Sequence, residues 1–201
     1  MNSFKAMLHE QRWDDHRYYH HSLINQSLHF ISATTFLCGY LILFFNPVIA
    51  SLLGWLLAMT ARQSGHFFFE PKDFDEVNQA THEYKEEVKV GYNLFRKWIL
   101  MGIWVLCPVL LLVDPALLGV FTPHATMAAF VRHLALMWLA LAVGGLLFRV
   151  VQLCFQRDPQ TAIVWAVKIL TDPLNDFRLY RAAPLRLLRG ERIDHGLAAA
   201  R

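Results

Sequence analysis

Metal-binding residue types gather at two places that flank the first apolar part of the chain. Residues 19–29 supply three histidines: His20, His21 and His29. Residues 65–70 supply His66 and, four positions later, Glu70. Side chains four apart lie on one face of a helix, so this second pair could hold one ion together. Imidazoles with a carboxylate and open positions suit non-haem Fe(II), and imidazoles without thiolates also suit zinc.

The spacing within the first cluster raises a problem of reach. On a helix, His21, Asn25 and His29 share one face and spread over about 80°. Each step of four residues climbs about 6 Å, so His21 and His29 would stand about 12 Å apart. Two imidazoles at that separation reach one ion only with a kink. Either one histidine of this pair is not a metal ligand and only supports a ligand, or the helix breaks near Ser22.

Two further histidines have helical spacing to a neighbouring polar residue. His16 precedes His20 by four residues, and His82 precedes Glu86 by four. The second pair lies in a strongly charged segment, where solvation is the simpler interpretation. The sequence leaves open whether His16 or His82 joins the site.

Long apolar segments must position these clusters. The chain has 201 residues, of which 55% are hydrophobic and 17% charged, whereas soluble domains carry roughly a quarter charged residues. A transmembrane helix needs about 20 apolar residues, and four segments approach this length, near residues 28–46, 48–69, 98–114 and 131–155. We therefore predict an all-α integral membrane protein with about four transmembrane helices.

The first two segments would form a hairpin that brings the two clusters together. A chain that crosses a bilayer and returns places His29 and His66 at the same membrane face. Histidine and tyrosine also gather at membrane interfaces as simple amphipathic anchors. Ionisable groups at membrane depth are costly, however, which favours a functional site at this position.

Charge predicts the orientation of the chain. Lysine and arginine number 3 in residues 1–27, 6 from residue 62 to residue 97 and 9 from residue 149 onward, out of 19 in all. The positive-inside rule therefore places both termini and the 62–97 segment in the cytoplasm. The metal site would face the cytoplasm, from the inner membrane of a bacterium or the endoplasmic reticulum of a eukaryote.

The chain then divides into five parts. Residues 1–27 form a histidine-rich amphipathic lead-in, 28–71 the first hairpin, 72–97 a charged cytoplasmic helix, 98–155 a second hairpin and 156–201 a basic tail. Arginines alternate with apolar residues in the tail, which is typical of a helix lying on an anionic membrane surface. Nucleic acid is excluded as a partner, because a membrane-tethered net charge of +3 is a poor phosphate binder.

The motif Tyr-His-His-x3-Asn-x3-His of residues 19–29, followed by Gly-His-x3-Glu of residues 65–70, resembles the 2-hydroxy fatty acid dioxygenase family. The resemblance covers about residues 15–71. It implies a Fe(II)-dependent membrane enzyme that uses dioxygen to shorten a 2-hydroxy fatty acid by one carbon. Carried over by position, the iron ligands would be His20, His21, His29 and His66, and the supporting residues would be Asn25 and Glu70.

Other functions remain open from the sequence. Arg62 could pair with the substrate carboxylate, although an arginine at a cytoplasmic span end also serves as a positive-inside anchor. Another lipid hydroxylase with non-haem iron could use the same residues, and zinc or a second metal could occupy them. A scaffold without catalysis, whose charged loop and basic tail recruit a partner, is the alternative from a different class.

Overall fold

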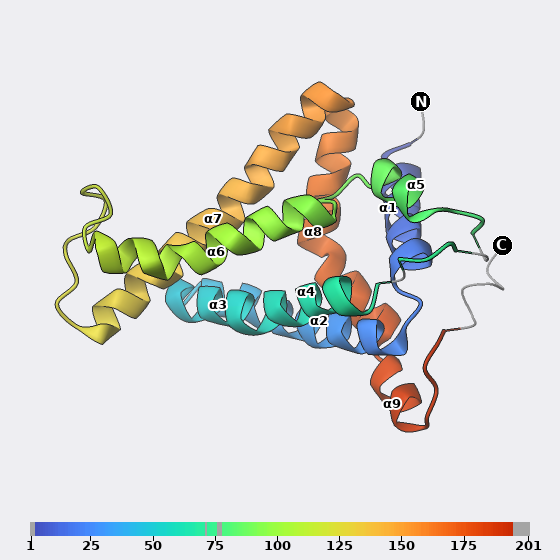
Figure 1. The fold of residues 1–201 in the computed structure, drawn as a ribbon, viewed down its shortest axis with the longest axis horizontal. Coiled ribbons are helices and arrows are strands. Elements are labelled where there is room, and N and C mark those ends of the chain that lie inside the picture. The colour runs from blue at the N-terminus through green and yellow to red at the C-terminus, as the bar shows by residue number, and fades with distance from the viewer. Residues whose placement is uncertain (1–2, 71, 76–77, 195–201) are drawn as a thin grey trace.

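The computed structural model describes residues 3–70, 72–75 and 78–194 (Figure 1). This part of the chain is helical, and its strand-like pairing is limited to two isolated bridges, Ser22 with Ile193 and Asp75 with Ala80. The all-α class expected from the sequence is therefore confirmed.

Three helices are long and apolar enough to cross a membrane: α2 (Leu23–Leu43), α6 (Leu94–Val113) and α7 (Met127–Gln156). Most of the apolar window of each helix is left uncovered by the rest of the protein. Long apolar helices with exposed apolar surfaces suit a lipid environment, where backbone polar groups are satisfied within each helix. The structure thus supports a membrane-embedded helical protein.

The second predicted span, residues 48–69, is built from consecutive pieces. These are α3 (Pro47–Leu53), a π-helical turn η1 (Gly54–Met59) and α4 (Thr60–Phe68). Asn46 caps α3, because its side chain accepts a hydrogen bond from the Ile49 N–H and Pro47 begins the helix. The three pieces pack back along α2 and complete the predicted hairpin. The count of four spans and the orientation of the termini stay predictions.

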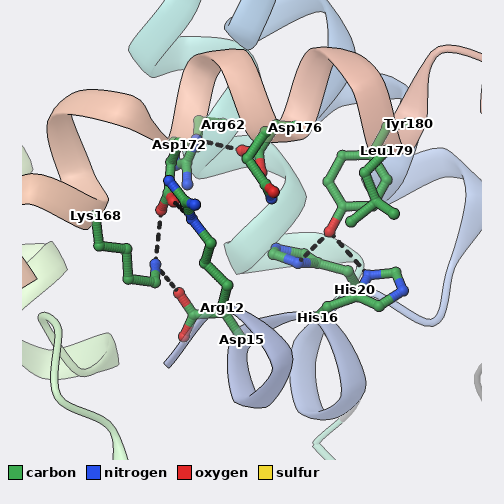
Figure 2. Close-up of a pocket in the computed structure, with 11 residues that line it drawn as sticks. Arg12, Asp15, His16, His20, Arg62, Lys168, Asp172, Asp176, Leu179 and Tyr180 are labelled. Carbon is green, nitrogen blue, oxygen red and sulfur yellow. Dashed lines mark hydrogen bonds and ion pairs between the residues drawn. The ribbon is translucent and has the colours of Figure 1, made fainter. Parts of the chain in front are cut away.

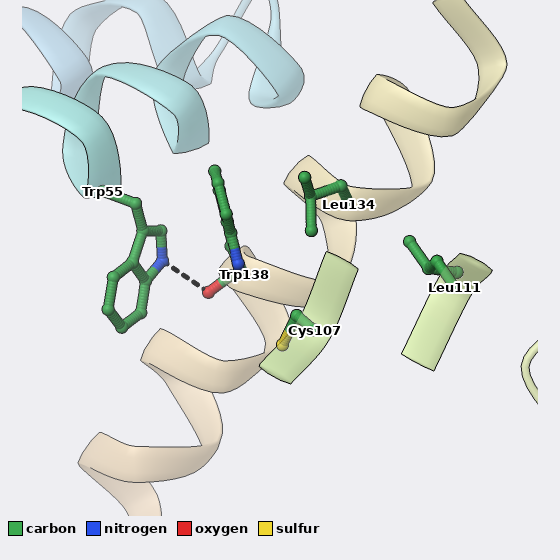
Figure 3. Packing of buried hydrophobic residues seen from close by; sticks show 5 residues of the cluster. All are labelled: Trp55, Cys107, Leu111, Leu134 and Trp138. Carbon is green, nitrogen blue, oxygen red and sulfur yellow. Dashed lines mark hydrogen bonds between the residues drawn. The ribbon is translucent and has the colours of Figure 1, made fainter. Parts of the chain in front are cut away.

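A tryptophan cluster holds this hairpin against the second pair of long helices. Trp55 of η1 donates its indole N–H to the Trp138 carbonyl of α7 at 2.7 Å (Figure 3). Trp138 donates in turn to the Trp104 carbonyl of α6 at 3.1 Å. Leu111 and Leu134 fill the space beside these rings. Buried indoles with satisfied N–H groups fix the relative positions of the long helices.

The remaining helices gather near the end of the hairpin where α2 begins and α4 stops (Figure 1). They are α1 (Phe4–Tyr19), α5 (His82–Val88), α8 (Pro159–Tyr180) and α9 (Ala183–Leu188). Helix α8 packs against α1, α2 and α7, and α9 packs against α2. This assembly of helices covers the hairpin end that carries the two histidine clusters.

The structure differs from the predicted charged helix at residues 72–97. Among its described residues, only α5, which is capped by Thr81, and the first turn of α6 are helical. Lys89 and Lys97 turn inward instead of facing solvent. Acidic side chains of the protein attract Lys89, which pairs with Glu70 at 3.1 Å and with Glu86 at 3.2 Å.

The tail packs against the rest of the protein, and its predicted place at a membrane surface stays a prediction. Its described part folds back onto the lead-in, since the Leu23 N–H donates to the Arg192 carbonyl and the Asp194 N–H donates to the His21 carbonyl, both at 2.9 Å. The physical reason is a polar stripe on α8 that faces inward: Lys168, Asp172, Asp176 and Tyr180. Residues 195–201 lie outside the described part.

Candidate metal centre

A break between α1 and α2 positions the first histidine of the cluster. Helix α1 ends at Tyr19, and the His20 backbone leaves the helical region at φ −117° and ψ 41°. Ser22 is extended, and α2 starts one residue later. The Asn25 amide donates to the Tyr19 carbonyl at 2.8 Å and fixes this turn. Of the two alternatives raised by the spacing, the structure has the break near Ser22.

The break folds His20 back over α2, where three imidazoles converge. The ring centroids of His20 and His29 are 4.1 Å apart, those of His29 and His66 4.9 Å, and those of His20 and His66 5.6 Å. One nitrogen from each ring lies within 4.8 Å of the other two, and all three side chains are buried. In the described part of the chain, this is the group of metal-binding side chains whose geometry could hold an ion.

Gly65 allows α4 to approach α2 closely enough for this convergence. A Cβ atom at position 65 would lie 2.2 Å from Asn25 Oδ1 and 3.4 Å from His29 Cδ2. The first distance is far below van der Waals contact, so a larger residue would push α4 away from α2. The glycine in the Gly-His motif therefore sets the distance between His66 and His29.

The Nδ1 atoms of the three rings face phenolic or acidic side chains. His20 Nδ1 is 2.9 Å from Tyr180 Oη, and His66 Nδ1 is 2.7 Å from Glu70 Oε2. His29 Nδ1 lies 3.7 Å from Asp176 Oδ2, which is longer than a hydrogen bond. Histidine ligands of metals commonly direct the second nitrogen to such a partner, which orients the ring.

Other ring nitrogens lack a partner. Nε2 of His20 and both nitrogens of His29 are buried without a hydrogen bond among the described residues. Leaving a buried polar atom unsatisfied costs about 1–3 kcal/mol. A divalent cation between the three rings would satisfy such atoms. The donor set of buried imidazoles therefore fits a first-row metal ion such as iron or zinc.

The surroundings keep His20 in the form that binds metals. Burial lowers the pKa of His20 well below its ordinary value, and the nearby His29, His66 and Arg62 lower it further. The imidazole is thus neutral at pH 7 and has a lone pair available for a metal ion.

A polar network of side chains from α1 and α8 lies next to His20 of the cluster (Figure 2). Tyr180 bridges His16 and His20, with Nδ1 of His16 at 3.0 Å from its hydroxyl. Lys168 pairs with Asp15 and, at 2.6 Å, with Asp172. The network borders a cleft of about 10 Å³, room for about one water molecule.

Sequence reasoning missed the contribution of α8. Its signal was present as a spacing of four through Lys168, Asp172, Asp176 and Tyr180, which places all four on one face of a helix. The run of basic residues that follows predicted a helix on the membrane surface instead. His82 stands at the start of α5, outside the group of converging imidazoles.

The structure does not bring every expected residue into the centre. His21 points away from the cluster: its Nε2 contacts the Arg17 carbonyl and lies 3.7 Å from Asp75 Oδ2. Arg62 pairs with Asp176 at 3.0 Å, so its guanidinium already has a carboxylate. Asn25 lies against Gly65 and holds the break with its amide. The Glu70 carboxylate is hydrogen-bonded to His66 Nδ1, so it can orient the His66 ring as a metal ligand.

A buried lysine that the sequence did not single out lies near the centre. Lys97 is 8% exposed, and its Nζ has no hydrogen-bond partner among the described residues. The next residue, Trp98, stacks on Phe67 of α4 with centroids 4.5 Å apart, which places this turn of α6 beside His66. A charged ammonium is costly at a buried position unless an anion pairs with it, so the charged form of Lys97 would favour an anionic ligand there.

Comparisons with known proteins identify no relative: no family model, no curated protein and no solved structure matches the chain.

The adjacent histidines His20 and His21 give a matched test of the centre. We expect His20→Ala, His29→Ala and His66→Ala each to lose most of the bound metal, because each removes one of three converging donors. His21→Ala and His124→Ala should retain it. The measurement is metal per chain by mass spectrometry after a mild chelator wash, with thermal unfolding to check folding. Equal metal content in the His20 and His21 variants would contradict the assigned ligand set.

Proposed function

We propose that this protein is a Fe(II)-dependent membrane dioxygenase that acts on 2-hydroxy fatty acids. The observation that supports a metal enzyme is the convergence of three buried imidazoles, with unsatisfied nitrogens, at one end of a membrane hairpin. Iron and the lipid substrate are inferred from the resemblance of the two motifs that carry these histidines. Dioxygen is the second substrate.

The proposed reaction consumes one dioxygen for each substrate molecule. Loss of the carboxyl carbon as CO2, with oxidation of the 2-hydroxy carbon to a carboxylic acid, removes four electrons. One O2 accepts four electrons, and its atoms balance the acid one carbon shorter, CO2 and one water. A dioxygenase therefore needs no external reductant for this conversion.

Each group of the centre has a role in this proposal. His20, His29 and His66 would hold Fe(II), which when bound would supply the redox chemistry that activates dioxygen. Tyr180 and Glu70 keep the His20 and His66 rings in place through their Nδ1 atoms. Burial by α8 excludes bulk water from the imidazoles.

Lys97 takes the role that the sequence suggested for Arg62. Arg62 is already paired with Asp176, whereas the Lys97 ammonium is buried and lacks a hydrogen-bond partner in the described part. The substrate carboxylate would pair with Lys97 while its 2-hydroxyl end lies at the metal. The acyl chain then extends along the apolar helices of the hairpin.

Glu70 gives the test of the proposed function. Glu70→Gln keeps the side-chain volume but removes the charge that accepts the His66 N–H. Because such a partner is typically worth about 10–100-fold in metal affinity or activity, turnover should fall by about that factor while the protein still folds. Oxygen uptake and CO2 release with 2-hydroxypalmitate in nanodiscs measure this, with thermal unfolding alongside. Wild-type uptake by a stable Glu70→Gln variant would remove Glu70 from the site. Iron-loaded wild-type protein that oxidises no 2-hydroxy acid would refute the dioxygenase proposal.

Lys97→Met tests carboxylate binding separately. This variant keeps the length of the side chain but removes the charge, so KM for 2-hydroxypalmitate should rise about tenfold or more, the effect of losing one charge-assisted hydrogen bond. Iron content should not change, and binding of hexadecane-1,2-diol, which lacks the carboxylate, should stay the same. Lys72→Met, on an exposed loop residue, is the matched control. An unchanged KM in Lys97→Met would assign the carboxylate to another residue.

A further inference from the structure

Helix α8 has its polar and apolar faces reversed relative to a soluble helix. Its ionic residues Lys168, Asp172 and Asp176 are buried. Apolar side chains are exposed on its other face: Ile163 is 54% exposed, Leu170 51% and Leu174 50%. At 100° per residue these three positions and Phe177 fall within a sector of about 60°, opposite the ionic residues. A helix on a water-exposed surface shows the opposite pattern.

The exposed face lies beside a membrane span. Tyr180 packs against Leu23 at the start of α2. The Phe177 ring stacks on Phe30, with centroids 5.3 Å apart. Further along, the Tyr40 hydroxyl donates to the Leu170 carbonyl at 3.2 Å. Residues 170–180 of α8 therefore cross α2 in the opposite chain direction, and the depth of α2 in a bilayer sets the depth of this part of α8.

The end of α8 carries the charge that suits a lipid headgroup region. Arg178 and Arg181 are exposed there, and Arg189 is exposed just after α9. These positions follow Tyr180, which lies level with the beginning of α2. Cationic side chains near the start of a span attract anionic headgroups, while Phe177 and Leu170 lie further along the span, beside Phe30 and Tyr40.

We propose that the outer face of α8, formed by Ile163, Leu170, Leu174 and Phe177, contacts the acyl chains of the bilayer. The charged residues of α8 lower its mean hydropathy, so hydropathy alone does not identify it as a membrane helix. Three of these, however, face the protein, where they are paired with Arg12, Asp15 and Arg62. The ionic network behind the imidazoles is then separated from lipid by the width of one helix.

Nitroxide labels test this face in the full-length chain in nanodiscs that contain anionic lipid. The native cysteines Cys38, Cys107 and Cys154 are first replaced, and thermal unfolding confirms that the protein folds. O2 concentrates in hydrocarbon, whereas a nickel chelate stays in water. The ratio of O2 collisions to nickel collisions should therefore be several-fold higher for labels at Leu170→Cys and Leu174→Cys than for labels at control positions. The controls are labels at Glu10→Cys and Glu87→Cys, which replace exposed charged residues.

Two results would overturn the proposal. Nickel collisions at 170 and 174 that equal those of the controls would show that the face meets water. Low collision rates with both reagents would show that a second copy or another protein covers it. Because the readout needs no bound iron, it is independent of the proposed function. A second variant, Leu174→Glu, should lower the unfolding temperature in nanodiscs by several degrees relative to Leu174→Met, whereas a water-exposed position would tolerate the charge.

Discussion

A continuous helix from α1 through α2 would hold His21 and His29 about 12 Å apart and would direct His20 to a different side. The interruption at residues 20–22 removes this constraint, because it lets His20 turn back onto α2. The Asn25 amide satisfies the Tyr19 carbonyl, and the Gln26 amide satisfies the His20 carbonyl at 2.9 Å. Side chains of α2 thus satisfy carbonyl groups that would be bonded within a continuous helix. The metal centre depends on these hydrogen bonds because they stabilise the break.

Charge balance explains why so many ionic groups surround an apolar hairpin. Buried carboxylates and cations are costly unless they are paired, and the network on α1 and α8 pairs Arg12, Arg62 and Lys168 with aspartates. Lys97 stands apart from this network, without a hydrogen-bond partner in the described residues. A metal ion held by neutral imidazoles would add further positive charge. The arrangement as a whole favours an anionic ligand.

Much of the site could be predicted from the sequence, and the exceptions have physical causes. The spacing of four between His66 and Glu70 predicted a shared helix face, and the two side chains are hydrogen-bonded. The choice between His20 and His21 could not be predicted, because adjacent side chains point about 100° apart and the choice depends on which residue ends the helix. The role of α8 was hidden because its charges, which face the protein, lower its hydropathy. The burial of Lys97 depends on how α6 packs against α4, which local patterns do not determine.

X-ray absorption at the iron edge tests the central claim most directly, on full-length protein loaded with Fe(II) in nanodiscs. The account predicts nitrogen and oxygen neighbours in the first shell and outer-shell scattering from three imidazole rings. In His66→Ala that scattering should fall to the level of two rings, and in His21→Ala it should not change. Sulfur neighbours, or an imidazole contribution that is absent or unaffected by His66→Ala, would contradict a centre built by His20, His29 and His66.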